Sequence, residues 1–134
     1  MTTRFAFVSL LLMSCPLAIF ALGADPIAEK ESKPVTLVID YGDGVQKHFT
    51  AIAWKQGLTV LDALRTAQAH PRGIRCEYTG SGATALLTKI DDVANEGRGR
   101  NWMYRVNGKL AEVGFGVRQL DPGDSILWKF EVYR

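Results

Sequence analysis

The residue types best suited to nucleophilic and acid–base chemistry in the body of the chain are Cys76, His48 and His70. A cysteine beside a histidine can act as a nucleophile, but the pair needs a third group to orient the imidazole and a lowered thiol pKa. The sequence has no paired C-x-x-C zinc ligands, no G-x-S-x-G motif and no phosphate-binding glycine loop. We therefore interpret Cys76 as a buried, unreactive thiol and expect no catalytic residues.

Side chains with oxygen atoms gather in the stretch that follows residue 90. Asp91, Asp92, Asn95 and Glu96 could offer ligands to a calcium ion, but they lack the spacing of an EF-hand loop. We therefore interpret the charged, glycine-containing stretch 91–100 as a solvated loop and predict no metal site.

Three arginines lie close to two aromatic residues in the sequence. Arg98, Arg100 and Arg105 could form a groove for single-stranded nucleic acid, with Trp102 and Tyr104 as stacking platforms. The formal net charge is only +2, whereas nucleic-acid binding normally shows as a clustered basic excess. We therefore expect exposed arginines flanking a core strand, and no nucleic-acid partner.

The stronger candidate for recognition is the segment at residues 113–117 (VGFGV). Phe115 stands between Gly114 and Gly116, which lets the backbone come close to another group while the ring offers a flat apolar face. The same pattern suits a ring that caps the core beneath a loop. Both interpretations of Phe115 stay open from the sequence.

The elements that position these residues begin with a β-hairpin. Residues 35–41 alternate as a strand, residues 42–44 (GDG) favour a tight turn, and residues 46–54 form the returning strand. The first strand places its apolar side chains on one face: Val35, Leu37, Ile39 and Tyr41.

One helix follows the hairpin. Thr59 suits the N-cap position, and Asp62 three residues later completes a variant of the capping box. His70 precedes Pro71, which ends the helix because proline restrains the residue before it. The helix carries an apolar stripe: Val60, Leu61, Leu64 and Ala67.

The rest of the chain reads as strands. Residues 74–79 and 84–90 are candidate strands around the turn at 80–82. Residues 101–107 alternate, with Trp102, Tyr104 and Val106 on one side, and end in a favoured hairpin dipeptide at 107–108.

A last turn and strand complete the pattern. Residues 121–124 (DPGD) suit a type II turn, because proline and glycine hold its central positions. The final strand places four apolar side chains on one face: Ile126, Trp128, Phe130 and Val132. We predict an α+β fold: a β-grasp-like mixed sheet of about five strands with one packed helix.

The N-terminus is typical of an export signal. A short basic start precedes a long apolar run, and small residues then stand before Asp25, so we predict a signal peptide over residues 1–24. The run is long enough to remain as a membrane anchor, and Cys15 offers a weak lipoprotein signal. We expect cleavage and an exported protein, with membrane contact only if this segment is retained.

The remainder divides into a linker and one domain. Residues 25–34 are polar and bracketed by prolines, which indicates a flexible linker. Residues 35–134 form the domain. The chain is 47% hydrophobic and 22% charged, a composition that excludes disordered and collagen-like classes. Cys76 has no intramolecular partner after cleavage, so we expect packing alone to hold the core.

Three motifs in order resemble the transcobalamin C-terminal-like domain, which many bacterial proteins carry as a domain of unknown function. They are GLTVLDAL at 57–64, WMYRVNG at 102–108 and GDSILW at 123–128, and the resemblance extends from about residue 35 to residue 133. In transcobalamin this domain closes over one face of cobalamin, while a separate helical barrel holds the other face. That barrel has no counterpart here, so the resemblance implies a partner chain in its place.

The resemblance also implies which residues would contact a ligand. Gly114, Phe115 and Gly116 match a ligand-facing element, Trp102 matches an aromatic residue that opens the preceding strand, and Tyr78 lies on a nearby loop. The expected function is an exported, non-catalytic binding module that contacts a cobalamin-like corrinoid, with no covalently bound cofactor. The alternative is a protein–protein interaction or accessory domain that pairs through a sheet edge and binds no small molecule.

Overall fold

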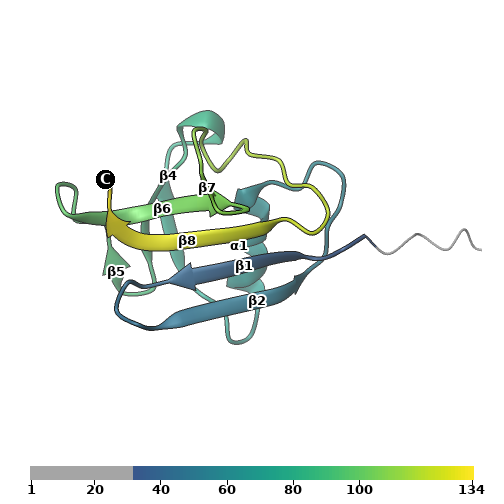
Figure 1. The fold of residues 1–134 in the computed structure, drawn as a ribbon, viewed down its shortest axis with the longest axis horizontal. Helices are drawn as coiled ribbons and strands as arrows, with labels where there is room; N and C mark the ends of the chain where they lie inside the picture. The colour runs from purple at the N-terminus through teal and green to yellow at the C-terminus, as the bar shows by residue number, and fades with distance from the viewer. Residues whose placement is uncertain (1–31) are drawn as a thin grey trace, which may run out of the picture.

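A computed structural model describes residues 32–134 as a mixed α+β domain with two sheets (Figure 1). The signal peptide expected at residues 1–24 and most of the linker expected at 25–34 lie outside the described residues. The described elements, in chain order, are β1 (Val35–Asp40), β2 (Gln46–Ile52), α1 (Val60–Ala69), β3 (Cys76–Thr79), the 3-10 helix η1 (Gly82–Thr84), β4 (Leu86–Ile90), β5 (Val93–Ala94), β6 (Arg100–Val106), β7 (Lys109–Leu110) and β8 (Ser125–Val132).

The larger sheet has five strands in the order β2-β1-β8-β6-β7. β1 and β8 run parallel at its centre, and the other neighbouring pairs are antiparallel. In Figure 1 this sheet faces the viewer and α1 lies behind it. The arrangement confirms the prediction of a mixed sheet with one packed helix, and it makes β2 an outermost strand.

The second sheet was not predicted. β3, β4 and β5 form a separate antiparallel sheet, so the strands expected at 74–79 and 84–90 do not join the larger one. The stretch 91–100, expected as a loop, contains the two-residue strand β5. Asp91 takes a left-handed φ of 52° in the turn between β4 and β5. A strand of two residues shows no periodicity, which is why the sequence pattern misses it.

The helix begins as its sequence predicts. The Thr59 hydroxyl accepts a hydrogen bond from the Asp62 N–H at 3.2 Å, and the Asp62 carboxylate accepts one from the Thr59 N–H at 3.0 Å. This is the complete capping box, which satisfies two of the free N–H groups at a helix start. One detail differs, because Ala63 is buried where Leu61 was expected and Leu61 is only partly buried.

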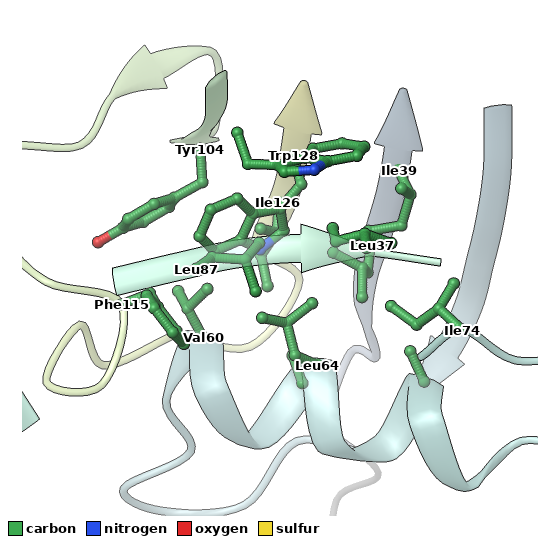
Figure 2. Close-up of a cluster of buried hydrophobic side chains, with 14 of the residues drawn as sticks. Leu37, Ile39, Val60, Leu64, Ile74, Leu87, Tyr104, Phe115, Ile126 and Trp128 are labelled. Carbon is green, nitrogen blue, oxygen red and sulfur yellow. The ribbon is translucent and has the colours of Figure 1, made fainter. Parts of the chain in front are cut away.

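The core lies between α1 and the larger sheet, with β4 contributing from the second sheet (Figure 2). The alternation predicted for three strands is confirmed almost throughout, since side chains of one parity are buried. Val132 is the exception and is 49% exposed, because it pairs with Arg100 at the end of the β6–β8 ladder. The buried strand residues are Val35, Leu37, Ile39, Tyr41, Trp102, Tyr104, Val106, Ile126, Trp128 and Phe130.

Two predicted turns have the expected geometry. Asn107 and Gly108 take φ values of 52° and 81° between β6 and β7, as a two-residue hairpin turn requires. The Asp124 N–H donates to the Asp121 carbonyl oxygen at 3.1 Å, and Gly123 has a φ of 81°. The Gly123 N–H also donates to the carbonyl oxygen of Lys33, so the end of the expected linker is already part of the fold.

No helix within residues 32–134 is both long and apolar enough to cross a membrane.

Candidate functional site

Phe115 lies in the core and not on the rim. Its side chain is 2% exposed and lies near Trp128 in the core (Figure 2). Its ring packs edge-on against Tyr78 at 5.7 Å and Trp128 at 5.3 Å between centroids. In this structure the ring therefore offers no flat face to solvent. The alternative, a ring that caps the core beneath a loop, describes its position.

The glycines beside Phe115 do permit a close backbone approach, and the partner is internal. A Cβ atom added to Gly114 would lie 2.5 Å from the Ala83 carbonyl oxygen. One added to Gly116 would lie 2.4 Å from the Gly82 carbonyl oxygen. Both distances are too short for real side chains, so these glycines let the 113–117 segment pack on η1.

The other residues predicted to contact a ligand, Trp102 and Tyr78, also make contacts within the domain. Trp102 is 5% exposed, and its indole N–H donates to the Val93 carbonyl oxygen at 2.9 Å. Tyr78 is half-buried, and its hydroxyl accepts a hydrogen bond from Arg65 at 3.3 Å. Phe115 and Tyr78 do come together, whereas Trp102 packs on a different aromatic pair, Tyr41 and Phe130.

The hollow next to the 113–117 segment is small. It measures about 240 Å³ and is lined by Val113, Arg118 and the β6–β7 hairpin. Pockets for drug-sized ligands usually measure about 300–1,000 Å³. A corrinoid is larger than such ligands, so this hollow alone does not hold one.

The arginine-rich stretch does not form a stacking groove. Trp102 and Tyr104 are 5% and 8% exposed, so their faces are not available to bases. Arg105 pairs with Glu131, and Arg100 pairs with Glu96 at 3.0 Å. Arg100 and Arg105 therefore serve ion pairs.

Three of the oxygen-bearing side chains after residue 90, those of Asp91, Asn95 and Glu96, bind separate intramolecular partners. The Asn95 amide accepts from the Trp102 N–H at 2.8 Å and donates to the Leu87 carbonyl oxygen at 2.7 Å. In the part of the chain that the structure describes, no three His, Cys, Asp or Glu side chains gather where they could hold a metal ion.

Asp91 ties the hairpin of β1 and β2 to the smaller sheet. Its carboxylate accepts hydrogen bonds from the Tyr41 hydroxyl, from Lys47 at 3.1 Å and from the Arg75 N–H at 3.0 Å. Burial alone would raise the pKa of Asp91, but these three donors outweigh burial and hold that pKa below its usual value. The charged carboxylate is therefore a structural anchor.

Cys76, at the start of β3, is an unsuitable nucleophile. Burial, and then the negative charge of Asp91, raise the pKa of its thiol to about 12. His48 hydrogen-bonds to Gln46, and His70 accepts from the Arg72 N–H, so neither imidazole is oriented toward the thiol by a hydrogen bond. A protonated thiol without a base has little reactivity.

The β6 side of the larger sheet is closed by hydrogen bonds. The Arg100 carbonyl oxygen accepts from the Glu96 N–H at 2.9 Å, and the Trp102 N–H donates to Asn95. The Tyr104 carbonyl oxygen accepts from the Ala111 N–H at 3.1 Å. Arg100, Trp102 and Tyr104 thus each have one outward backbone group paired with a segment beside β6.

The β2 side of the same sheet is open. The Tyr41 N–H donates to the Val45 carbonyl oxygen, so antiparallel alternation directs the backbone groups of Gln46 and His48 away from β1. Within residues 32–134, no strand lies beyond β2 and no hydrogen bond occupies these outward groups. Beside this edge lies a groove, formed between β2 and the C-terminal half of α1.

The groove, which we call the β2–α1 groove, measures about 420 Å³. One wall is the strand itself, and the other includes Thr66, His70 and Arg72. Phe49 is half-buried along it and packs edge-on against His70, with ring centroids 5.8 Å apart. It is lined by Lys47, His48, Phe49, Thr50, Ala51, Ile52, Thr66, His70 and Arg72.

Sequence reasoning did not single out this groove. The polar, partly alternating residues of β2 were identified as a strand, but the pattern does not say that the strand would be outermost. The signal that was available is the polarity of both faces of β2, since Gln46, His48 and Thr50 lie on one face and Lys47 on the other.

Comparison with known proteins places this fold in a family. The solved structure of a candidate metal-binding protein from Ruminococcus gnavus is similar to this one with a TM-score of 0.56 and 13% sequence identity, over 77% of this chain and 100% of that chain. This likeness concerns the fold alone. No curated protein matches the sequence. The model of a family called a domain of unknown function, DUF4430, matches residues 57–132, which include α1, both sheets in part and the 113–117 segment. Because this match spans more than half of the sequence, the chain belongs to the DUF4430 family.

Proposed function

We propose that this protein is an exported, non-catalytic binding module that engages a partner protein through its open sheet edge. The single observation that carries this proposal is the contrast between the two sides of the larger sheet. Arg100, Trp102 and Tyr104 of β6 each have an outward backbone group hydrogen-bonded, whereas within residues 32–134 no hydrogen bond reaches the outward groups of Gln46 and His48 beside the β2–α1 groove.

An exposed edge of this kind is a template for another strand. Natural proteins usually protect such edges, because unpaired N–H and C=O groups recruit other chains. An extended segment that adds to the edge gains main-chain hydrogen bonds, while a neighbouring pocket takes its side chains. The groove volume of about 420 Å³ falls within the usual range for a bound ligand group.

A catalytic function has little support from the side chains. Cys76 is protonated because burial and Asp91 raise its pKa to about 12, and the carboxylate of Asp91 is engaged by three donors. The motifs that suggest a cobalamin-like ligand remain, but the ring expected to contact it, Phe115, is 2% exposed. A corrinoid would have to meet a different surface, together with a partner chain.

The test selects peptides that bind the protein and then maps where they bind. A library of random heptapeptides is panned against the purified protein, and the selected peptides are added to the 15N-labelled protein. We expect the amide resonances of Gln46 and His48 to shift and their hydrogen exchange to slow. Cobalamin and cobinamide serve as the small-molecule arm, read from the corrin absorption spectrum.

Two results would overturn the proposal. One is a set of selected peptides that shift resonances elsewhere and leave the β2 amides unchanged. The other is a corrinoid that changes its spectrum on binding while no peptide is selected. As a variant, His48→Pro removes an outward N–H without breaking a bond to β1, so we expect it to fold and to lose peptide binding.

A further inference from the structure

The charges along the β2–α1 groove indicate which kind of segment would occupy the open edge. Resting on the proposed function, we infer that the occupant is an extended acidic peptide. Its backbone pairs with Gln46 and His48, and its carboxylate side chain meets Arg72 and His70.

The groove has a direction. At one end, Lys47 reaches the Gly73 carbonyl oxygen at 3.3 Å, and the ring of Phe49 packs on His70. Thr50, Ala51 and Ile52 of the strand and Thr66 of the helix also line the groove. The helix α1 crosses the strands of the larger sheet (Figures 1 and 2), and the contacts of Lys47 and Phe49 place the first half of β2 beside the C-terminal end of the helix.

The basic groups lie together at that first end. Arg72 and His70 are exposed, and no ion pair to either is present in the described portion of the chain. Among residues 32–134, no aspartate or glutamate lines the groove. Lys47 also lines it, but this lysine is paired with Asp91 at 3.1 Å and adds little net charge.

His70 is oriented to donate. Its Nδ1 atom accepts a hydrogen bond from the Arg72 N–H at 3.1 Å, so the neutral ring carries its proton on Nε2. The Nε2–H of His70 and the guanidinium of Arg72 are both donors along the same groove, and a carboxylate can accept hydrogen bonds from either. The positive charge of Arg72 would repel a lysine or arginine side chain in the occupant.

The edge also limits how much of the occupant can pair. Leu37 stands opposite Phe49, but Val35 stands opposite Ile52, so the register shifts between these two pairs. Such an irregularity bends a strand and interrupts its edge. The regular part of β2 thus offers pairing to about four residues of an added strand, at about 3.3 Å per residue.

Synthetic heptapeptides test this inference directly. The acidic probe alternates valine and glutamate, a second probe replaces each glutamate by lysine, and a third keeps the glutamates but carries N-methyl groups on its backbone. Binding is followed by the amide shifts of Gln46 and His48 in the full chain. We expect the acidic probe to bind at least about tenfold more tightly than the other two, and the difference from the lysine probe to shrink at high salt.

Matched variants locate the charge contact. Arg72→Glu should weaken the acidic probe about tenfold and strengthen the lysine probe. Arg98→Glu makes the same charge change on an exposed loop outside the groove, and it should leave both affinities unchanged. The thermal midpoint of each variant is measured alongside, so that loss of binding is not confused with loss of fold.

The outcomes separate this inference from the proposed function. Equal binding of the acidic and lysine probes at β2 would overturn the acidic occupant and leave edge pairing in place. Equal binding of the N-methylated probe would overturn edge pairing itself. An Arg98→Glu effect as large as that of Arg72→Glu would show a general charge effect and would also overturn the inference.

Discussion

The 113–117 segment and the β2–α1 groove present opposite cases of how a residue pattern relates to exposure. The segment carries the aromatic and glycine pattern of a binding loop, yet Phe115 is sealed against Tyr78 and Trp128. The groove carries no recognisable motif, yet no described segment hydrogen-bonds to the outward backbone groups of Gln46 and His48 on its strand.

The difference follows from what each region needs. A large ring gains most by leaving water, so an aromatic residue between glycines is drawn into any gap in the core that the backbone can reach. The openness of a strand edge depends on whether another segment covers it. In this domain the turn after β5 and the residue after β7 cover β6, and no described segment covers β2.

The largest expected effect concerns the sealed side of this comparison. Phe115→Ala should lower the free energy of unfolding by about 3–5 kcal/mol, because it leaves a cavity in the core. Urea denaturation measures the change. Val113→Ala in the same segment is the control and should cost less than about 1 kcal/mol, since Val113 is 50% exposed. Similar values for the two variants would mean that Phe115 is not a core residue.

The second prediction tests the closed β6 edge against the open β2 edge. Asn95→Ala removes both the acceptor of the Trp102 N–H and the donor to the Leu87 carbonyl oxygen. We expect a loss of about 2–3 kcal/mol and faster hydrogen exchange at Trp102, because buried polar groups would lose their partners. Thr50→Ala on the exposed edge should change stability by less than about 0.5 kcal/mol. Unchanged exchange at Trp102 would contradict the closure of β6 by Asn95.

The third prediction concerns the tie that fixes β2 beside the groove. Because hydrogen bonds hold the pKa of Asp91 below its unfolded value, its ionised form stabilises the fold above the unfolded pKa of about 4. That contribution is lost as pH falls through the folded pKa. Asp91→Asn should therefore cost about 1–3 kcal/mol near neutral pH and progressively less in acid.

The check is to measure urea midpoints of the Asp91→Asn variant and of the unmodified protein. The measurements run from about pH 2 to about pH 7, a range that brackets the pKa of an aspartate. Asparagine tolerates the left-handed φ of 52° at this position, so backbone strain does not confuse the comparison. A stability difference that stays constant down to the lowest pH would exclude the charge of Asp91 as the cause.

The smallest expected effect lies in the groove itself. Arg72→Ala should leave the free energy of unfolding within about 0.5 kcal/mol, because the side chain is exposed and forms no ion pair within the described residues. The acidic heptapeptide should nevertheless bind more weakly to this variant. A large loss of stability would instead assign Arg72 a role in the fold.

Local sequence patterns predicted most of the individual elements. The capping box of Thr59 and Asp62, the hairpin turn at Asn107 and Gly108, and the alternation of β8 each depend on residues that are close in the chain. The candidate site was predicted less well. Phe115 and Tyr78 do lie together, but Phe115 and Trp102 are buried. The β2–α1 groove, which is open to solvent, was not identified from the sequence.

The amino-acid sequence by itself determined the helix, the main strands, their buried faces and the tight turns, because capping, side-chain alternation and positive φ are local properties. Only the tertiary structure decided that β3, β4 and β5 form their own sheet and that β2 is left at an open edge. Strand order and the closing of an edge depend on contacts between residues far apart in the chain. The physical reason is that a strand carries the same local pattern whether or not a neighbour hydrogen-bonds to it.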